Sequence, residues 1–212
     1  MYSISKHIFF SKNKLLSNFE MLYNFENSLT FANVFKTIYK DLGVRYPKYF
    51  KMDALSKLGF LSTEVLLQNR SLTEIYKSEK IGIIVANSAS TYIMDSKHQA
   101  SLDDKESYFP SPANFVYTLP NIMTGEICIR HKFKGENAVF ISEEFDTEFI
   151  YKYTNKLLID NKLDATIVGY VNIDNDDYEA FLMLVENKEG EIFDLNTLKE
   201  TYTKYKLLTW IN

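Results

Sequence analysis

A short, unbroken apolar run in the first half of the chain limits the possible folds more than any other feature. Residues 81–86 read Ile-Gly-Ile-Ile-Val-Ala and include no polar side chain. A strand with one face in water alternates apolar and polar residues, so an uninterrupted run of this length predicts a central strand covered on both faces. Such a sheet needs helices on both sides, and the chain is therefore expected to be an α/β protein.

Patterns on either side of this run predict the elements that surround it. Helices are predicted over residues 29–42, 53–68, 145–161 and 195–205, with a modest helix through Tyr92 and His98. Strands are predicted over residues 3–10, 137–142, 163–173 and 178–186, the last two joined by a hairpin turn at 174–177. This order of elements predicts a layered mixed sheet with helices on both faces.

Two prolines set the boundaries of the middle segment. Pro112 follows Ser111 and suits the first turn of a helix, because its missing N–H would have no intrahelical partner there. Pro120 interrupts that helix, and an apolar face resumes at Ile122. The polar residues 101–107 before this segment are expected to form a loop.

Length and charge exclude several classes of protein. The 212 residues fit a single domain, residues 1–212, with a substantial core. The net charge is −4 and Lys and Glu are mixed along the chain, so no nucleic-acid partner is expected. No run of about 18 apolar residues occurs that could span a membrane, and the N-terminus does not fit a signal peptide. The lone Cys128 fits a reducing compartment, and we expect a cytoplasmic protein.

A block in the middle of the chain carries the strongest functional signal. Residues 111–127 read Ser-Pro-Ala-Asn-Phe-Val-Tyr-Thr-Leu-Pro-Asn-Ile-Met-Thr-Gly-Glu-Ile, and residues 134–137 read Lys-Gly-Glu-Asn. Both stretches resemble the segment before the nucleophilic cysteine of the β-ketoacyl-acyl-carrier-protein synthases, which belong to the thiolase-like superfamily. The residues that carry this match are Leu119, Pro120, Asn121, Gly125, Gly135 and Asn137.

Further stretches extend the resemblance over residues 45–171. Residues 51–59 are similar to the first core helix of the ketosynthases, and residues 81–88 to the strand and small-residue turn after it. Residues 164–171 and 180–186 are similar to the strands that close the first half of the family's fold. The resemblance therefore implies a thiolase-like half fold, because a complete ketosynthase continues into a second half that carries two histidines in Gly-rich motifs.

The resemblance places Glu144 where the ketosynthases have their cysteine, within Ser-Glu-Glu-Phe-Asp at residues 142–146. Condensation needs a thiolate that accepts the acyl group and an oxyanion hole. The resemblance thus implies a catalytically inactive subunit without a cofactor, similar to the chain-length factors of type II polyketide synthases, in which the cysteine is also replaced. Its expected partners are a full-length ketosynthase, an acyl carrier protein, or both, in bacterial fatty-acid, aryl-polyene or polyketide-type pigment biosynthesis.

Two other functions stay open. Glu144 could act as a general base or decarboxylation aid in a small enzyme that decarboxylates or hydrolyses acyl thioesters. Alternatively, the chain could be a module that binds a carrier protein or an acyl chain.

Residues 138–142 are expected to form an interface between subunits. This short segment is apolar and β-prone, and the resemblance places it at the edge of the sheet, where the strand pairs with its twofold mate. A bare edge of this kind invites pairing with another chain, so we expect a homodimer or a heterodimer. The interface residues are Ala138, Val139, Phe140, Ile141 and Ser142.

The reactive side chains outside these motifs have simpler interpretations. Cys128 lies three residues before His131, which would allow a thiol-imidazole pair on one helix face. The resemblance instead places Cys128 inside a packing helix, and a core cysteine is favoured. His7 and His98 have no partners at metal-ligand spacing, so no metal site is expected.

Two acidic groups are also interpreted as structural. Asn172, Asp174 and Asp176 resemble the start of a calcium loop, but the sixth and twelfth positions lack the required Gly and Glu, so a solvated turn is favoured. A second group is expected to charge the N-terminus of a helix favourably. Its members are Glu143, Glu144, Asp146 and Glu148.

Overall fold

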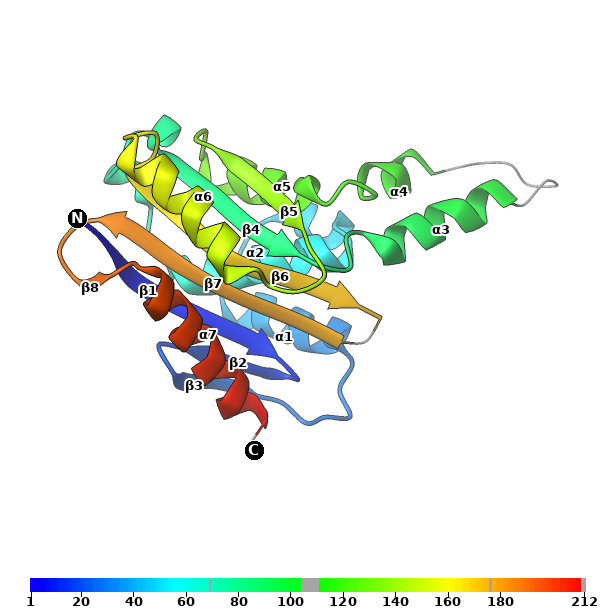
Figure 1. Ribbon diagram of the computed structural model, residues 1–212. Coiled ribbons are helices and arrows are strands. Elements are labelled where there is room, and N and C mark those ends of the chain that lie inside the picture. The colour runs from blue at the N-terminus through cyan, green and yellow to red at the C-terminus, as the bar shows by residue number, and fades with distance from the viewer. Residues whose placement is uncertain (69, 104–110, 176, 211–212) are drawn as a thin grey trace.

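One mixed β-sheet organises the molecule, shown in Figure 1 as a computed structural model that describes residues 1–68, 70–103, 111–175 and 177–210. Within these residues the strand order is β3-β2-β1-β7-β6-β4-β5, and the short β8 pairs with β1. β4 runs parallel to β5 and β6, and the other pairs are antiparallel. The strands are β1 (Tyr2–Ser11), β2 (Lys14–Ser17), β3 (Glu20–Asn24), β4 (Ile81–Asn87), β5 (Asn137–Ile141), β6 (Ala165–Asp174), β7 (Asp177–Asn187) and β8 (Glu191–Ile192).

Helices cover both faces of this sheet (Figure 1). α1, α2 and α5 contribute to the apolar core on one face, and α6 and α7 to the core on the other face. α3 and α4 extend away from the sheet beyond the end of β4. The helices are α1 (Phe31–Asp41), α2 (Ala54–Leu67), α3 (Tyr92–Asp103), α4 (Pro112–Val116), α5 (Asn121–His131), α6 (Thr147–Ile159) and α7 (Leu195–Trp210), with the 3₁₀ helices η1 (Pro47–Lys51), η2 (Leu72–Glu74) and η3 (Ser78–Lys80). No helix in this described part of the chain is both long enough and apolar enough to cross a membrane.

The predicted fold class is confirmed. β4 lies between β6 and β5, and all seven of its residues are buried, as expected for a strand covered on both faces. The predicted helices over residues 29–42, 53–68 and 145–161 correspond to α1, α2 and α6 with slightly shorter bounds. α7 reaches Trp210 and is longer than the helix predicted over residues 195–205.

The β2–β3 hairpin is an addition that the sequence patterns did not predict. One tight turn joins β1 to β2 and a second joins β2 to β3, and each uses a pair of residues with positive φ: Lys12 at 48° with Asn13 at 59°, and Asn18 at 48° with Phe19 at 66°. Paired positive φ angles suit the tight turns of hairpins, and an asparagine in each pair tolerates the left-handed conformation. Those asparagines are the signal by which the hairpin could have been found.

The loop expected over residues 101–107 is wrong at its start. Residues 101–103 complete α3, and residues 104–107 lie outside the described part of the chain. The break at Pro120 is confirmed, since α4 ends before it and Pro120 caps α5. The hairpin turn between β6 and β7 is also confirmed by the pairing of Asp174 with Asp177.

Close backbone contact joins β4 to the loop before β5. The Gly135 N–H donates to the carbonyl oxygen of Ile81 at 3.1 Å, and a Cβ atom on Gly135 would lie 2.6 Å from that oxygen. A Cβ atom on Gly82 would likewise lie 2.6 Å from the carbonyl oxygen of Glu136. Neither position has room for a side chain, so packing explains the glycine of the Lys-Gly-Glu-Asn motif.

A buried hydrogen-bonded group fastens α7 to the sheet. The Tyr205 hydroxyl lies 2.6 Å from His7 Nδ1 and accepts a hydrogen bond from the backbone N–H of Phe19 at 3.1 Å. Burial lowers the pKa of His7 to about 4, so this imidazole is neutral at physiological pH. His7 thus holds the helix on the sheet.

A buried ion pair fixes the far end of β7. The Glu186 carboxylate is fully buried and accepts hydrogen bonds from Arg70 Nη1 at 3.1 Å and Nη2 at 2.9 Å. Burial alone would raise the pKa of Glu186, but these bonds and Lys188 at 3.1 Å lower it to about 2. The loop after α2 is thereby tied to the sheet by a charged contact.

Candidate functional site

The N-terminus of α6 is the candidate site, because the sequence resemblance places its nucleophile position there. Asp146 caps the helix by accepting the backbone N–H of Phe149 at 2.9 Å, and Glu148 pairs with Lys152 at 2.6 Å. The Asp146 contact confirms that this residue caps the helix, and the Glu148–Lys152 pair lies within the helix as an i,i+4 ion pair. Glu143 and Glu144 are both exposed.

Among the residues that the structure describes, the Glu144 side chain has no partner that would make it a catalytic base. Its only hydrogen bond among the described residues is through the backbone, whose carbonyl oxygen accepts the Ser142 hydroxyl at 2.6 Å. Glu144 does not line the pockets beside α1, beside Asn13 or beside Gly135 in the described part of the chain. The carboxylate therefore faces solvent.

The next residue, Phe145, fills the space between α6, the sheet and α7. Its ring stacks on Tyr170 of β6 at 5.5 Å between ring centroids. It also meets Phe181 of β7 at 5.9 Å and Tyr202 of α7 at 5.0 Å, both edge to face. Only 9% of Phe145 is exposed, so an aromatic cluster occupies the sheet surface beside Glu144.

The hydroxyl groups of this aromatic cluster are occupied by structural hydrogen bonds. The Tyr170 hydroxyl lies 2.6 Å from Ser88 Oγ, and the Tyr202 hydroxyl donates to Glu179 Oε1 at 2.6 Å. Burial raises the pKa of both tyrosines, and the Glu179 charge raises that of Tyr202 further. Both phenols consequently stay protonated at neutral pH and offer no nucleophile.

β5 forms one edge of the sheet, as the resemblance implied (Figure 1). Ala138 and Phe140 pack toward α6 and Val139 packs toward the opposite core, whereas Ile141 is 50% exposed. The flanking helices add exposed apolar side chains, Ile129 of α5 and Phe149 of α6. Apolar surface thus surrounds an unpaired strand edge.

The backbone of β5 has donors on its outer side to which no strand of the described residues pairs. The Ser142 N–H donates to the carbonyl oxygen of Asn87 in β4. Because successive N–H groups of a strand point in opposite directions, those of Val139 and Ile141 face away from β4. No strand of the described chain lies on that side.

The Leu-Pro-Asn and Lys-Gly-Glu-Asn motif residues lie near this edge. Thr124 of α5 donates its hydroxyl to the side chain of Asn137 at 3.3 Å, which links α5 to the start of β5. Gly125 faces open space on α5, and both Leu119 and Asn121 are exposed. Among the motif glycines, packing therefore constrains Gly135 and leaves Gly125 free.

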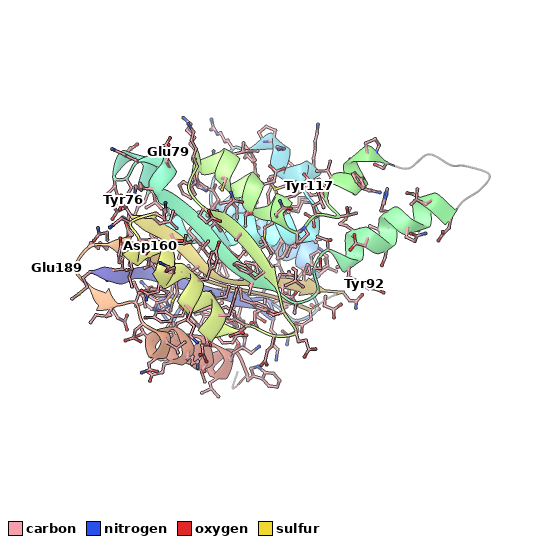
Figure 2. The ribbon with its side chains drawn as sticks, turned by 45° about the horizontal axis from the view of Figure 1, so that its top comes forward. Tyr76, Glu79, Tyr92, Tyr117, Asp160 and Glu189 are labelled. Carbon is pink, nitrogen blue, oxygen red and sulfur yellow. The ribbon has the colours of Figure 1, made fainter. Side chains whose placement is uncertain are left out.

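Tyr117, within the same motif, anchors the segment between α4 and α5. Its side chain is buried and its hydroxyl donates to Glu126 at 3.4 Å, whereas Tyr92 on the projecting α3 is exposed (Figure 2). Burial and the neighbouring Glu126 raise the pKa of Tyr117 to about 12. This segment is held to the body of the molecule by a buried phenol.

Cys128 and His131 do not form a catalytic pair. His131 Nε2 lies 3.2 Å from Glu64 Oε1, which also accepts a hydrogen bond from Arg130 Nε at 2.9 Å. Cys128 packs against the core, and burial raises the pKa of its thiol to about 11. The interpretation as a packing cysteine agrees with these contacts.

The histidine and calcium-loop candidates also have structural surroundings. His98 packs against the Phe115 ring, with 5.5 Å between centroids. The Asn172 side chain accepts the backbone N–H groups of Ser88 and Ala89 at 3.2 and 2.8 Å, while Asp176 lies outside the described residues. Within the described residues, no group of three His, Cys, Asp or Glu side chains is arranged to hold a metal ion.

Comparisons with known proteins identify the fold. No protein-family model and no curated protein sequence matches the chain. A chain of the ishigamide ketosynthase/chain length factor matches with a TM-score of 0.62 and 13% identity over 87% of this chain. The AntDE:AntF complex, a type II PKS acyl-carrier protein with its ketosynthase bound to the hexaketide, matches with a TM-score of 0.62 and 10% identity over 87% of this chain.

A third match comes from Xenorhabdus doucetiae. The complex of the ketosynthase ApeO with its chain length factor ApeC gives a TM-score of 0.53 and 14% identity, covering 89% of this chain and 80% of the matched one. The present chain spans 62% of the length of each of the first two matched chains. The chain therefore has the thiolase-like fold of ketosynthases and chain length factors, which confirms the resemblance at the level of fold.

Proposed function

We propose that the chain is a ketosynthase-like subunit without condensing activity that pairs with an active, full-length ketosynthase. The observation that carries this proposal is the combination, on one ketosynthase-like fold, of an open β5 edge and an α6 N-terminus without a nucleophile. The subunit needs no cofactor for this role. Its place is the bacterial cytoplasm.

The contacts at α6 support the absence of condensing activity. A condensing enzyme needs a nucleophile that accepts the acyl group from a thioester. Transfer to the Glu144 carboxylate would instead produce a reactive anhydride, and Glu144 faces solvent outside the pockets. Phe145 and its aromatic neighbours occupy the adjacent sheet surface, where the thioester would have to approach.

The β5 edge supports a protein partner. The N–H groups of Val139 and Ile141 can donate to a strand of another chain, and the exposed side chains of Ile141 and Phe149 would be covered at the same time. Pairing of strand edges extends the sheet across two subunits and removes an aggregation-prone edge. Pairing of this edge with a full-length ketosynthase would give a heterodimer, and pairing with a second copy of the chain would give a homodimer.

The matched complexes support the kind of pathway. These complexes contain ketosynthases with chain length factors, and in one case an acyl-carrier protein with its ketosynthase. By analogy, the partners of this chain would be a ketosynthase and an acyl carrier protein of bacterial fatty-acid, aryl-polyene or polyketide-type pigment biosynthesis.

Co-expression with ketosynthases encoded near its gene tests the proposal. The purified mixture is passed over a size-exclusion column with light-scattering detection, and a complex of the two chains is expected. Val139→Pro should abolish the complex, because proline removes an outward-facing donor and leaves the β4 ladder intact. Val139→Ala keeps that N–H and serves as the matched control. A chain that stays monomeric and binds none of these ketosynthases would contradict the proposal.

The alternative of a small acyl-thioester enzyme has a direct test. Hydrolysis or decarboxylation of acyl thioesters that disappears in Glu144→Gln would favour the enzyme. The solvent exposure of Glu144 and the filled space around Phe145 favour the partner subunit instead. We expect the wild-type chain and Glu144→Gln to hydrolyse and decarboxylate acyl thioesters at the same negligible rate.

A further inference from the structure

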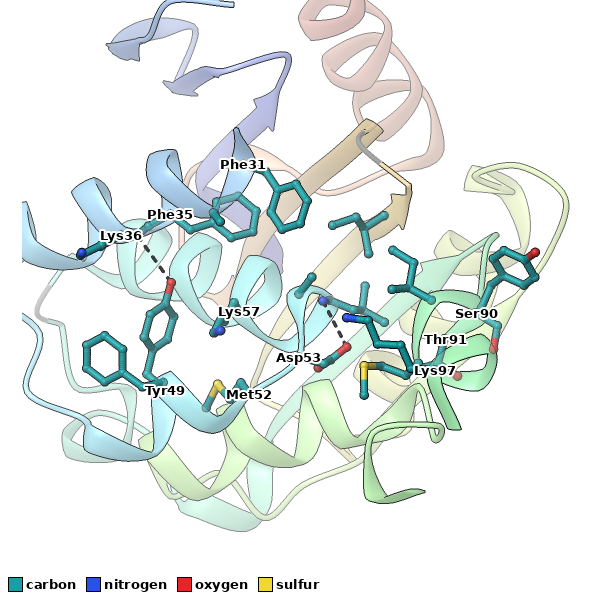
Figure 3. A pocket seen from close by; sticks show the side chains of 18 residues that line it. Phe31, Phe35, Lys36, Tyr49, Met52, Asp53, Lys57, Ser90, Thr91 and Lys97 are labelled. Atoms are coloured by element: carbon teal, nitrogen blue, oxygen red, sulfur yellow. Dashed lines mark hydrogen bonds between the residues drawn. The ribbon is translucent and has the colours of Figure 1, made fainter. Parts of the chain in front are cut away.

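A pocket separate from the α6 N-terminus lies on the opposite face of the sheet. It has a volume of about 520 Å³, within the range of ligand-binding sites in proteins. α1, η1, the start of α2, the turn between β4 and α3, and the end of β6 enclose it (Figure 3). Glu144, Phe145 and the residues of β5 do not line it.

The wall of this pocket is largely apolar. Phe31 and Phe35 come from α1, Met52 lies just before α2, and Met94 and Ile173 come from α3 and β6. Two flexible methionines allow the wall to adapt to a chain-like ligand. An apolar chain would bury its surface here at a gain of about 25 cal/mol per Å².

Three lysines from three helices line the same pocket, and Figure 3 shows Lys57 and Lys97 on its Asp53 side, whereas Lys36 points away from both. Lys36 comes from α1, Lys57 from α2 and Lys97 from α3. In the described part of the chain, none of these ammonium groups lies within 4 Å of a carboxylate oxygen. Burial lowers the pKa of Lys57, Asp53 opposes this shift, and the charge of Lys97 lowers the pKa further, so Lys57 and Lys97 lie close enough to act on each other.

Asp53 does not cancel this positive charge. Its carboxylate caps α2, with Oδ2 accepting the N–H of Leu55 at 3.2 Å and Oδ1 that of Ser56 at 3.0 Å. Both oxygens are thus engaged with the helix N-terminus. Three cations against one capped carboxylate leave the pocket with a net positive charge.

We infer that this pocket binds a single-chain amphiphile, whose apolar tail lies among the phenylalanine and methionine side chains and whose anionic head meets Lys57 and Lys97. Charge complementarity selects the head, because a neutral or cationic head would leave the lysines without a counter-charge. The apolar wall selects the tail. The site is distinct from the proposed partner edge and does not require the partner.

Calorimetric titration with decanoate and with decyl phosphate, each below its micelle concentration, tests this inference. One-to-one binding of either anion supports the site, and the tighter one identifies the head group. Decanol is the neutral control and should bind at least tenfold more weakly. Decanol that binds as tightly as both anions would overturn the role of the lysines.

Matched variants locate the binding site. Lys57→Gln with Lys97→Gln should weaken binding by at least tenfold, whereas Lys40→Gln, on α1 but outside the pocket, should leave it unchanged. Ala32→Trp should block the pocket, and Thr37→Trp on the exposed side of α1 is its control. Circular dichroism confirms that each variant is folded.

Three outcomes would refute the site. The first is that neither decanoate nor decyl phosphate binds at concentrations up to about 1 mM. The second is binding that Ala32→Trp leaves intact. The third is loss of ketosynthase binding in Ala32→Trp without any amphiphile binding, which would assign the pocket to a protein side chain.

Discussion

Replacing Phe145 by alanine tests whether this ring is packed in the core beside the candidate site or leaves that space open to a substrate. A phenylalanine with 9% exposure removes on the order of 180 Å² from water, which corresponds to about 4.5 kcal/mol at about 25 cal/mol per Å². The unfolded chain already buries part of this area, so about 3–4 kcal/mol is expected, within the usual range for Phe→Ala in a core. The melting temperature should fall by about 10 °C.

Urea unfolding followed by circular dichroism measures this loss. Phe149→Ala is the matched control, because Phe149 lies on the same helix but is 42% exposed, and about 1 kcal/mol is expected for it. A loss below about 1 kcal/mol for Phe145→Ala with an unchanged denaturant slope would show that the ring does not fill a packed space. The aromatic cluster would then be open to a substrate, and the proposed lack of catalysis would lose its structural support.

Three further predictions follow from the contacts of single residues. Gly135→Ala should destabilise the fold by roughly 2 kcal/mol or more, because the added Cβ has no room. Gly125→Ala should be neutral or stabilise the fold by about 0.5–1 kcal/mol, because this position faces open space on a helix. Urea unfolding of the two variants measures the difference. Cys128 should react with a thiol reagent far more slowly than free cysteine at pH 8, and its rate should rise toward pH 11; fast reaction at pH 8 would mean that the thiol is not buried. The folded-state pKa of Glu186 lies below its unfolded value of 4.5, so its pairing with Arg70 stabilises the fold fully above about pH 4.5. On the order of 3 kcal/mol of this stability is lost as the pH falls toward 2. Glu186→Gln should flatten this part of the plot of unfolding free energy against pH, and an unchanged plot would contradict the assignment.

The central sheet was predictable because its strands carry strong local patterns. The apolar run of β4 and the two strands joined by the turn at Asp174 need no long-range information to be identified. The hairpin of β2 and β3 was missed because Lys14 and the polar residues of β3 conceal the alternation. Only the asparagines at its turns mark it.

The candidate sites were less accessible to sequence reasoning. Residues 143–146 read as a charged helix start, and nothing local shows that Phe145 is buried, because its cover comes from Tyr202 in α7. The positive pocket was missed for the same reason. Lys57 and Lys97 lie on separate helices, and only the packing of those helices brings both of them to the pocket.

Hydrogen–deuterium exchange on β5 is the most direct test of the proposed pairing. In the isolated chain, the outward N–H groups of Val139 and Ile141 should exchange fast, because no strand of the described chain bonds to them. In the presence of the partner ketosynthase, both amides should become protected while Phe140, already bonded toward β4, changes little. Protection confined to other segments, or no protection with any ketosynthase encoded near the gene, would contradict the role of this chain as a partner subunit.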